Sequence, residues 1–321
     1  MVPASIGDRE SSLNRDVVLC ESISPSGLIP VHRIPSGLCI EMGTVGENSM
    51  ADRAKVVLVT GASSGLGLAI ARALAAKNHR VFGTVRTTPV RAGEDFVTLP
   101  LDVTRDESVG ECIAQIIRDA GRIDAVVNNA GFGIAGAIED TTSAEALSQF
   151  ETNFFGAHRV CRAVLPHLRA QQAGTIINMS SLAGRIPLPF QGFYSATKFA
   201  IEAYTEALRM EVRPFGITVS MIEPGDFATS FTANRRMTKE TTACSPYYES
   251  AVRAVAAMAR DEQANADLSP VVRAVESILA SRRPALRYPR ANAIQRTFNA
   301  LRPFLPQGAA ESLIRKTYGL K

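Results

Sequence analysis

The stretch KVVLVTGASSGLGLAI (55–70) places a glycine-rich loop between a short apolar run and an amphipathic pattern. The β-branched run 56–59 predicts a buried strand, and the apolar spacing from Leu66 onward predicts a helix. Gly61, Gly65 and Gly67 allow the backbone to turn tightly and to approach a ligand closely. A helix that starts here also offers free N–H groups and a positive dipole end to an anion. The stretch therefore predicts a strand–loop–helix unit that holds a phosphate group.

The same alternation continues along the chain. Strand-like runs recur at 80–86, 96–103, 123–131, 175–181 and 217–225, with helical patterns such as 106–121 and 143–171 between most of them. Runs that are apolar on both faces indicate parallel strands buried beneath helices, and right-handed crossovers then give a doubly wound sheet. We therefore expect an α/β fold, with a Rossmann-like doubly wound parallel sheet in a single domain over 50–321 and a short C-terminal helical extension.

The composition of the chain argues against several classes of function. Of the 321 residues, 46% are hydrophobic and 21% are charged, which is ordinary for a globular protein with a sizeable core. The net charge of +4 is too small to indicate nucleic-acid binding. The 5 Cys and 4 His are scattered without metal-ligand spacing, so we expect reduced thiols, no metal and a cytoplasmic location. Among the apolar runs, none approaches the ~18 residues of a membrane span.

Residues 1–49 differ from the rest of the chain. They are rich in Ser, Pro and Gly and lack sustained periodicity, which predicts a poorly ordered extension. Met50 directly precedes the ordered pattern, so the true start of the protein could lie there. An ordered N-terminal arm is the alternative.

The end of the second expected strand indicates which dinucleotide is bound. The run FGTVRTTPVR (82–91) contains no acid, and the first one after it is Glu94. An NAD site usually places an acid here, whereas the guanidinium of Arg86 matches a 2′-phosphate. We therefore predict NADP; a solvated surface arginine is the alternative. Asp102, followed by Val103 after the third strand, is expected to accept from the adenine amino group, or else to serve a turn.

Seven motifs occur together in one order. They are TGASSGLG (60–67), LDV (101–103), NNAG (128–131), Asn153, Ser181, YSATK (194–198) and IEPG (222–225). In this order and spacing, residues 50–290 resemble the short-chain dehydrogenases/reductases, in the shorter, non-extended type. Residues 181–209 are similar to the branch that contains 17β-hydroxysteroid and retinol dehydrogenases.

The YSATK motif places Tyr194 and Lys198 one helical turn apart on the same face. A carbonyl that accepts a hydride needs a proton on its oxygen, and Tyr194 is the expected acid in reduction and base in oxidation. A charge on Lys198 at ~4 Å would lower the tyrosine pKa by about three units before burial opposes it. Ser181, thirteen residues before Tyr194, is expected to hold the carbonyl oxygen. Ser180 would face the other side of a strand.

The resemblance implies further roles around the expected site. Asn153 would hold a water in a proton relay, although a buried Asn that bonds backbone is the alternative. Asn128 and Gly131 would close the pocket beside the cofactor, or else cap the fourth strand, and Lys198 would bond the nicotinamide ribose. The full set of expected cofactor contacts is Gly61, Ser63, Ser64, Gly65, Leu66, Gly67, Arg86, Asp102, Val103, Asn129, Ala130, Gly131, Tyr194, Lys198, Pro224, Gly225 and Thr229.

Two segments are expected on the substrate side. The stretch 226–248 is polar and weakly periodic, which predicts a substrate lid over 226–260. An apolar pocket is one interpretation of nearby aromatic residues and ordinary packing is the other; these residues are Phe132, Phe227, Phe231, Tyr247 and Tyr248. The basic extension 282–321 carries apolar residues at helical spacing from Ile294. We expect it to pack on its own domain or a subunit partner, and contact with an anionic membrane is the less favoured alternative.

These observations predict an oxidoreductase that transfers a hydride between NADP(H) and a ketone, aldehyde or alcohol. The substrate is expected to be an apolar small molecule that is steroid-, retinoid- or lipid-like, and the enzyme a homodimer or homotetramer that binds no nucleic acid. One alternative is an NADP(H)-sensing binding protein without turnover, which would be expected to lack Tyr194, Lys198 or Ser181. Another is an enzyme of the same fold that acts on a sugar-type substrate.

Overall fold

The first strand, β1 (Val56–Val59), is buried on both sides, and its side chains alternate between two hydrophobic cores. Val56 and Leu58 enter one core, while Val57 and Val59 enter the other. This alternation explains why the run is apolar at every position. The computed structural model describes residues 54–86 and 94–320; the expected N-terminal extension 1–49 lies outside the described residues.

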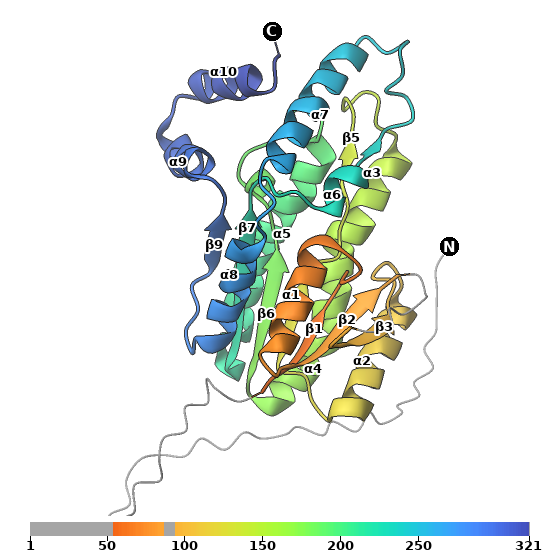
Figure 1. The fold of residues 1–321 in the computed structure, drawn as a ribbon, viewed down its shortest axis with the longest axis vertical. Coiled ribbons are helices and arrows are strands. Elements are labelled where there is room, and N and C mark those ends of the chain that lie inside the picture. The colour runs from red at the N-terminus through yellow and green to blue at the C-terminus, as the bar shows by residue number, and fades with distance from the viewer. Residues whose placement is uncertain (1–53, 87–93, 321) are drawn as a thin grey trace, which may run out of the picture. The chain divides into compact units, whose positions relative to one another are not determined.

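Seven parallel strands form the main sheet, in the order β3-β2-β1-β4-β6-β7-β9 (Figure 1). The strands that follow β1 in this sheet are β2 (Arg80–Val85), β3 (Val97–Pro100), β4 (Ala125–Asn128), β6 (Gly174–Met179), β7 (Ile217–Pro224) and β9 (Arg287–Arg290). The chain runs from β1 outward to β3 and then returns to β4 on the other side of β1. The predicted doubly wound sheet is confirmed, and its switch point lies between β1 and β4.

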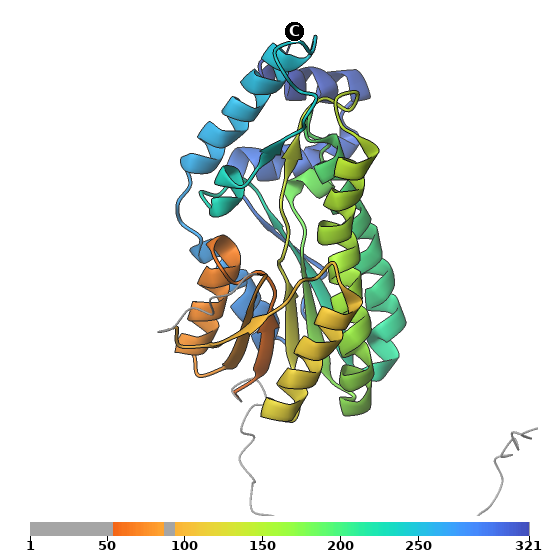
Figure 2. The same ribbon diagram turned by 90° about the vertical axis from the view of Figure 1, so that its right-hand side faces the viewer.

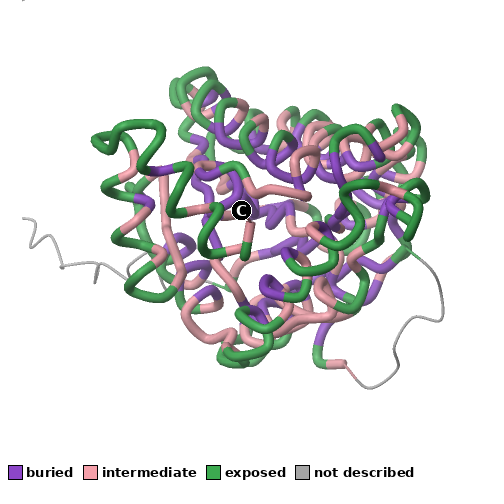
Figure 3. Tube along the Cα trace, turned by 90° about the horizontal axis from the view of Figure 1, so that it is seen from above, coloured by how far each residue is buried: buried purple, intermediate pink, exposed green. Residues whose placement is uncertain are grey.

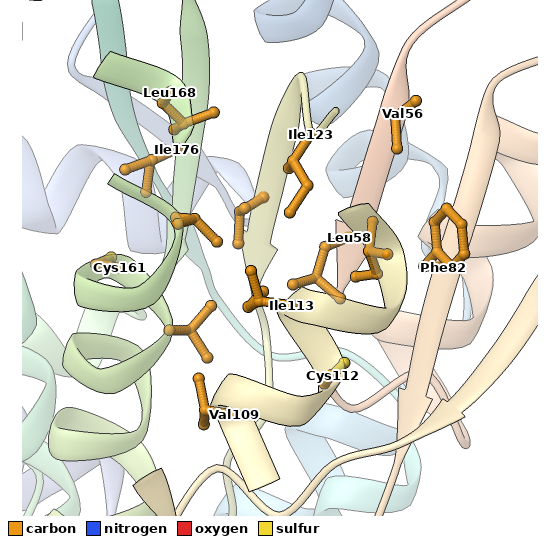
Figure 4. Close-up of a cluster of buried hydrophobic side chains, with 14 of the residues drawn as sticks. Val56, Leu58, Phe82, Val109, Cys112, Ile113, Ile123, Cys161, Leu168 and Ile176 are labelled. Atoms are coloured by element: carbon orange, nitrogen blue, oxygen red, sulfur yellow. The ribbon is translucent and has the colours of Figure 1, made fainter. Parts of the chain in front are cut away.

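Helices cover both faces of this sheet (Figure 2). The helices are α1 (Gly65–Ala76), α2 (Asp106–Ala120), α3 (Ser143–Phe150), α4 (Gly156–Gln171), α5 (Gly192–Val212), α6 (Ser230–Ala233), α7 (Tyr248–Gln263), α8 (Ser269–Ala280), α9 (Ala293–Leu301) and α10 (Gln307–Thr317). One core joins α1 and α8 to the sheet, and the other joins α2, α4 and α5 to it. In Figure 4, Val109 and Ile113 of α2 lie among side chains of the strands and of α4. Burying one such side chain fully contributes about 1.5–3 kcal/mol.

Strand β9 was not predicted, because its sequence RYPR has neither an apolar run nor alternation. Its proline is tolerated at the edge of the sheet, where one side of the strand has no neighbour to pair with. Charge holds the strand in place: Arg287 Nη1 donates to the buried Glu223 at 2.8 Å and Arg287 also pairs with Glu202 and Glu206. A buried carboxylate needs such a partner. Part of the basic segment 282–321, namely β9, therefore belongs to the sheet.

Helices α6, α7, α9 and α10 lie beyond the carboxyl ends of the strands (Figures 1 and 2). The segment 226–260, which is expected to act as a lid, contains α6, most of α7 and the short strand β8 (Arg236–Met237). β8 pairs in parallel with β5 (Ile134–Ala135), which the sequence patterns did not indicate. Among the described residues, no helix has the length and apolar character to span a bilayer.

The start of α1 packs so closely on the loop before it that a side chain larger than glycine does not fit at Gly67. A Cβ there would lie 2.2 Å from the Gly61 carbonyl oxygen and 2.5 Å from Asn129 Nδ2. Gly67→Ala should therefore lower the free energy of unfolding by about 1–3 kcal/mol. Urea unfolding followed by circular dichroism measures it.

Gly110→Ala on α2 is the matched control, because a Cβ there meets nothing within 4 Å. Helix propensity should make that variant about 0.5–1 kcal/mol more stable. Equal stability changes in the two variants would contradict this account of Gly67.

Candidate active site

A cavity of about 780 Å³ opens at the switch point, between the carboxyl ends of the strands and the helices beyond them. All four expected catalytic residues line it, namely Ser181, Asn153, Tyr194 and Lys198. The expected cofactor contacts that line it are Gly61, Ser63, Ser64, Gly65, Leu66, Arg86, Asp102, Val103, Asn129, Ala130, Gly131, Tyr194, Lys198, Pro224, Gly225 and Thr229. The structure thus brings together residues that lie up to 168 positions apart in sequence.

The glycine loop has the backbone geometry that a bound phosphate requires. Gly61 and Gly65 have φ angles of +67° and +56°, which residues with a side chain rarely adopt. The residue before α1, Ser64, makes no side-chain cap, and the first turn of α1 contains no acid. By contrast, Thr142 caps α3 with its hydroxyl. The first turn of α1 is therefore suited to an anion, which fits the diphosphate of a dinucleotide.

Two residues expected beside the cofactor have structural roles instead. Gly67 does not line the cavity; it allows α1 to approach the Gly61 carbonyl. Asn128 points into the sheet, where its Nδ2 donates to Asn178 Oδ1 at 2.9 Å. Asn178 in turn donates to Thr205 of α5 at 2.9 Å. The expected role of Asn128 in closing the pocket is therefore wrong, because its amide is used to join β4, β6 and α5.

Arg86 lies at the end of β2, is exposed and lines the cavity. The first acid after it, Glu94, forms a bidentate pair with Arg72 of α1 at 2.8 Å and is absent from the cavity lining. Asp102 lines the cavity, and its Oδ1 accepts from the backbone N–H and the hydroxyl of Thr104. Asp102 therefore serves the turn and also lines the cavity. Its contact with adenine stays a prediction.

Tyr194 and Lys198 lie on the first turns of α5 and are both buried. Lys198 Nζ donates to the Met179 carbonyl at the end of β6 at 2.7 Å, and lies 5.7 Å from the centre of the Tyr194 ring. The Ser181 hydroxyl donates to the Pro224 carbonyl at 3.4 Å, and its interaction with Tyr194 acts to lower the pKa of that phenol. The three groups expected to handle the carbonyl oxygen and its proton therefore meet at one end of the cavity.

The pKa values differ from the expected pattern. Burial raises the pKa of Tyr194 to about 12, although the hydrogen bond from Ser181 acts in the opposite direction. Burial lowers the pKa of Lys198 to about 8. Lys198 points to the Met179 carbonyl, and it is not among the groups that lower the Tyr194 pKa. The charges of Glu262 and Asp226 add to the effect of burial, and the charge of Arg235 acts against it. The expected lowering of the Tyr194 pKa is therefore wrong for the protein's own residues, and Tyr194 is protonated at neutral pH.

Asn153 lies in a π-helical turn, Glu151–Phe155, between α3 and α4. Such turns often occur at functional sites. Its Oδ1 accepts from the Phe132 N–H at 3.1 Å, and its Nδ2 donates to the Phe132 carbonyl at 2.9 Å. This is the backbone-bonding role that the sequence left open, and it holds the loop after β4. The proton relay stays a prediction.

The substrate side of the cavity includes three of the five expected aromatic residues, namely Phe132, Phe227 and Phe231. The ring of Phe231 lies 5.3 Å from that of Tyr194. Tyr247 and Tyr248 do not line the cavity; the Tyr247 hydroxyl donates to Glu139 outside it. The pocket interpretation is thus wrong for these two residues, because α7 begins beyond the cavity rim.

Several cavity residues were missed by the sequence patterns. From α9 and α10 and the residue after α10 come Ile294, Gln295, Phe298, Leu313, Ile314, Thr317 and Tyr318. Gln191 also lines the cavity: it is buried, and its Nε2 has no partner among the described residues. It lies directly before the first residue of α5, outside the helix, so the helical spacing around Tyr194 did not indicate it. The spacing from Ile294 predicts an amphipathic helix, but it does not say what the apolar face of that helix packs against, so the residues of α9 and α10 could not be assigned to the cavity.

Two acidic residues line the cavity near Tyr194. Asp226 and Glu262 both line the cavity, and both oppose ionisation of Tyr194. Burial raises the pKa of Asp226 to about 6, although a hydrogen bond from Gln295 of α9 acts in the opposite direction. Glu262 pairs with the buried Arg235. The lid segment and α9 therefore meet at the cavity through polar groups.

The fold and this site define a dehydrogenase of the nucleotide-binding α/β class. The profile of the short chain dehydrogenase family matches residues 55–240, and the chain belongs to the short-chain dehydrogenase/reductase family. It is an oxidoreductase, and a nicotinamide cofactor, NAD or NADP, is typical of the family.

Comparisons with individual proteins agree with this assignment. The 3-ketodihydrosphingosine reductase of Bacteroides thetaiotaomicron is 39% identical over 267 residues, which cover 83% of this chain and 99% of that protein. Retinol dehydrogenase 8 of Bos taurus is 35% identical over 279 residues, or 81% and 88% of the two chains. The crystal structure of a short-chain dehydrogenase from Streptomyces avermitilis aligns with a TM-score of 0.69 and 33% identity, covering 83% and 98%. The resemblance to retinol dehydrogenases is thereby confirmed.

The burial of Lys198 leads to a prediction about stability. Lys198→Met should raise the free energy of unfolding at pH 7 by about 1–3 kcal/mol, because an apolar side chain replaces a buried ammonium. The gain should be full below pH 8 and fade between pH 8 and 10.5, where folded protein holds Lys198 neutral while the unfolded chain is still protonated. Urea unfolding across this pH range measures it. A gain that does not vary with pH, or a loss at pH 7, contradicts the assigned burial cost.

Proposed function

We propose that this enzyme reduces the carbonyl group of an apolar, lipid-like substrate with NADPH. The observation that carries the proposal is the meeting of Ser181, Tyr194 and Lys198 in a cavity that phenylalanine and aliphatic side chains also line. The reverse reaction, oxidation of the alcohol, uses the same groups in the opposite order.

The residues would act on the carbonyl as follows. NADPH, when bound along the glycine loop, supplies the hydride. Ser181 donates a hydrogen bond to the carbonyl oxygen and holds it beside Tyr194. Tyr194 gives its proton to this oxygen as negative charge develops on it, so that the carbonyl becomes an alcohol. Lys198 carries a charge below pH 8 and would then stabilise the tyrosinate that remains.

The protonated state of Tyr194 fits its proposed role as the proton donor in reduction. With a pKa of about 12, Tyr194 is a proton donor at neutral pH and is poorly suited to act as a base by itself. An alkoxide is far more basic than a phenolate, so transfer of the proton remains downhill. Oxidation would instead require a second positive charge near the ring, such as that of an oxidised nicotinamide.

The cavity supports an apolar substrate. Phenylalanine side chains from three segments line it, and α9 and α10 add aliphatic ones. Two relatives bear names that refer to a sphingoid and a retinoid substrate, both of which are largely apolar. A long-chain ketone or aldehyde of this kind is therefore the class we propose for this enzyme.

The preference for NADP rests on Arg86. Its guanidinium lines the cavity at the end of β2, and Glu94, the first acid that follows, is paired with Arg72 instead of lining the site. A fixed fork of donors suits a phosphate, whereas an acid at this position would repel it.

Tyr194→Phe tests the chemistry. Loss of the proton donor should reduce turnover of a long-chain ketone about 10²–10⁴-fold, while the dissociation constant for NADPH stays within about twofold. Stopped-flow absorbance and NADPH fluorescence measure the two quantities. Tyr204→Phe is the matched control on the same helix; the Tyr204 hydroxyl bonds His158 Nδ1 outside the cavity, so turnover should be unaffected. Unchanged turnover in Tyr194→Phe would refute the mechanism, and a wild-type protein that binds NADPH without turnover would favour a sensing role.

Arg86→Asp tests the cofactor. The ratio of kcat/KM for NADPH to that for NADH should fall about 10–100-fold, because an attractive charge becomes a repulsive one. Initial rates with each cofactor measure it. Arg80→Asp places the same change at the opposite end of β2 and should leave the ratio unchanged. If Arg86→Asp still prefers NADPH as strongly as the wild type does, Arg86 does not select the cofactor.

A further inference from the structure

The C-terminal helices expose more large apolar side chains than any other part of the described chain. Five of the fifteen exposed large hydrophobic residues lie within 294–313, and we call these five the terminal apolar cluster: Ile294, Leu301, Phe304, Leu305 and Leu313. Ile294 is 82% exposed and Phe304 is 84% exposed. Figure 3, which looks onto the end of the molecule where the chain terminates, shows this segment as largely exposed. The stripe from Ile294 was expected to pack against a neighbour, yet of its residues only Phe298 is half-buried.

This cluster is continuous with the rim of the cavity. Ile294 and Leu313 line the cavity although both are exposed, so they stand where it opens to the outside. Ile294, Phe298 and Leu301 share one face of α9, because they are spaced by about one and two turns. One apolar face therefore runs from the cavity onto the surface of the molecule.

The charge around the cluster indicates what covers it. Residues 293–317 carry Arg296, Arg302, Arg315 and Lys316 against the single acid Glu311. Arg287 and Arg290, earlier in the basic segment, bind other groups: Arg287 pairs with Glu223 of β7, and Arg290 donates to the Pro270 and Pro289 carbonyls. A second copy docked through the same surface would bring these like charges together. An anionic lipid surface satisfies both the apolar side chains and the charges.

We propose that α9, the following turn Arg302–Phe304 and α10 dock on an anionic lipid bilayer and hold the cavity opening against it. Moving an alkyl chain through water costs free energy for each methylene group. With the opening at the bilayer surface, an apolar substrate enters the cavity without that step. The substrate part of this statement rests on the proposed function, while the docking itself does not.

Vesicle binding tests the proposal without substrate or cofactor. The full chain is mixed with vesicles of phosphatidylcholine alone, or with about 30% phosphatidylglycerol added, and bound protein is measured by flotation. We expect binding to the anionic vesicles, about tenfold weaker binding without the anionic lipid, and release by high salt. Phe304→Glu and, separately, Arg296→Glu should each weaken binding at least about tenfold.

Met210→Glu is the matched control. Met210 is 71% exposed on α5 and does not line the cavity, so the same change there should leave vesicle binding within about twofold of the wild type. Circular dichroism confirms that each variant is folded. Phe304 does not line the cavity either, so Phe304→Glu should retain wild-type activity on a short, water-soluble ketone.

Absence of vesicle binding, or equal binding by wild type and Phe304→Glu, would overturn the proposal. So would a concentration-dependent dimer, measured by light scattering, that Phe304→Glu abolishes while vesicles remain unbound, because a second copy would then cover the surface. Binding to anionic vesicles without turnover of any apolar carbonyl would leave the docking in place and refute the proposed function. Turnover of such a carbonyl without vesicle binding would refute the docking and leave the proposed function in place.

Discussion

The hydrogen bond from Lys198 Nζ to the Met179 carbonyl fixes the active-site face of α5 against the end of β6. Ser181 follows β6 by two residues, and Tyr194 precedes Lys198 by one helical turn. This contact therefore helps to set the distance between Ser181 and Tyr194. Further along the helix, Asn178 and Thr205 repeat the connection between the same two elements. Two polar contacts along one helix restrict both its rotation and its sliding.

Burying Lys198 and Tyr194 costs free energy, which the rest of the fold offsets. Lys198 and Tyr194 have pKa values of about 8 and 12, and both are displaced by burial toward the neutral form. A site surrounded by water would not show these displacements, and its charges would be screened. The two hydrophobic cores on either side of the sheet supply the stability that allows such a site to persist.

The sequence predicted the sheet, the glycine loop and the presence of Tyr194 and Lys198 in one cavity because their signals are local. A strand, a loop and a helix meet within 55–70, and Tyr194 lies one turn from Lys198. It did not predict β9, where ion pairs of Arg287 replace apolar burial. It also placed Asn128 and Gly67 beside the cofactor, although contacts with distant residues use them otherwise. The residues of α9 and α10 at the cavity, and the raised pKa of Tyr194, depend on tertiary burial, which no spacing encodes.

Transfer of deuterium from NADPH labelled at C4 to a long-chain ketone tests the central claim most directly. With the label on the transferred face, mass spectrometry should find the alcohol product heavier by one deuterium at the former carbonyl carbon, and the hydroxyl proton should come from solvent through Tyr194. An unlabelled alcohol, or labelled cofactor that is never consumed with any apolar ketone or aldehyde, would contradict the account of this site as a hydride-transfer centre.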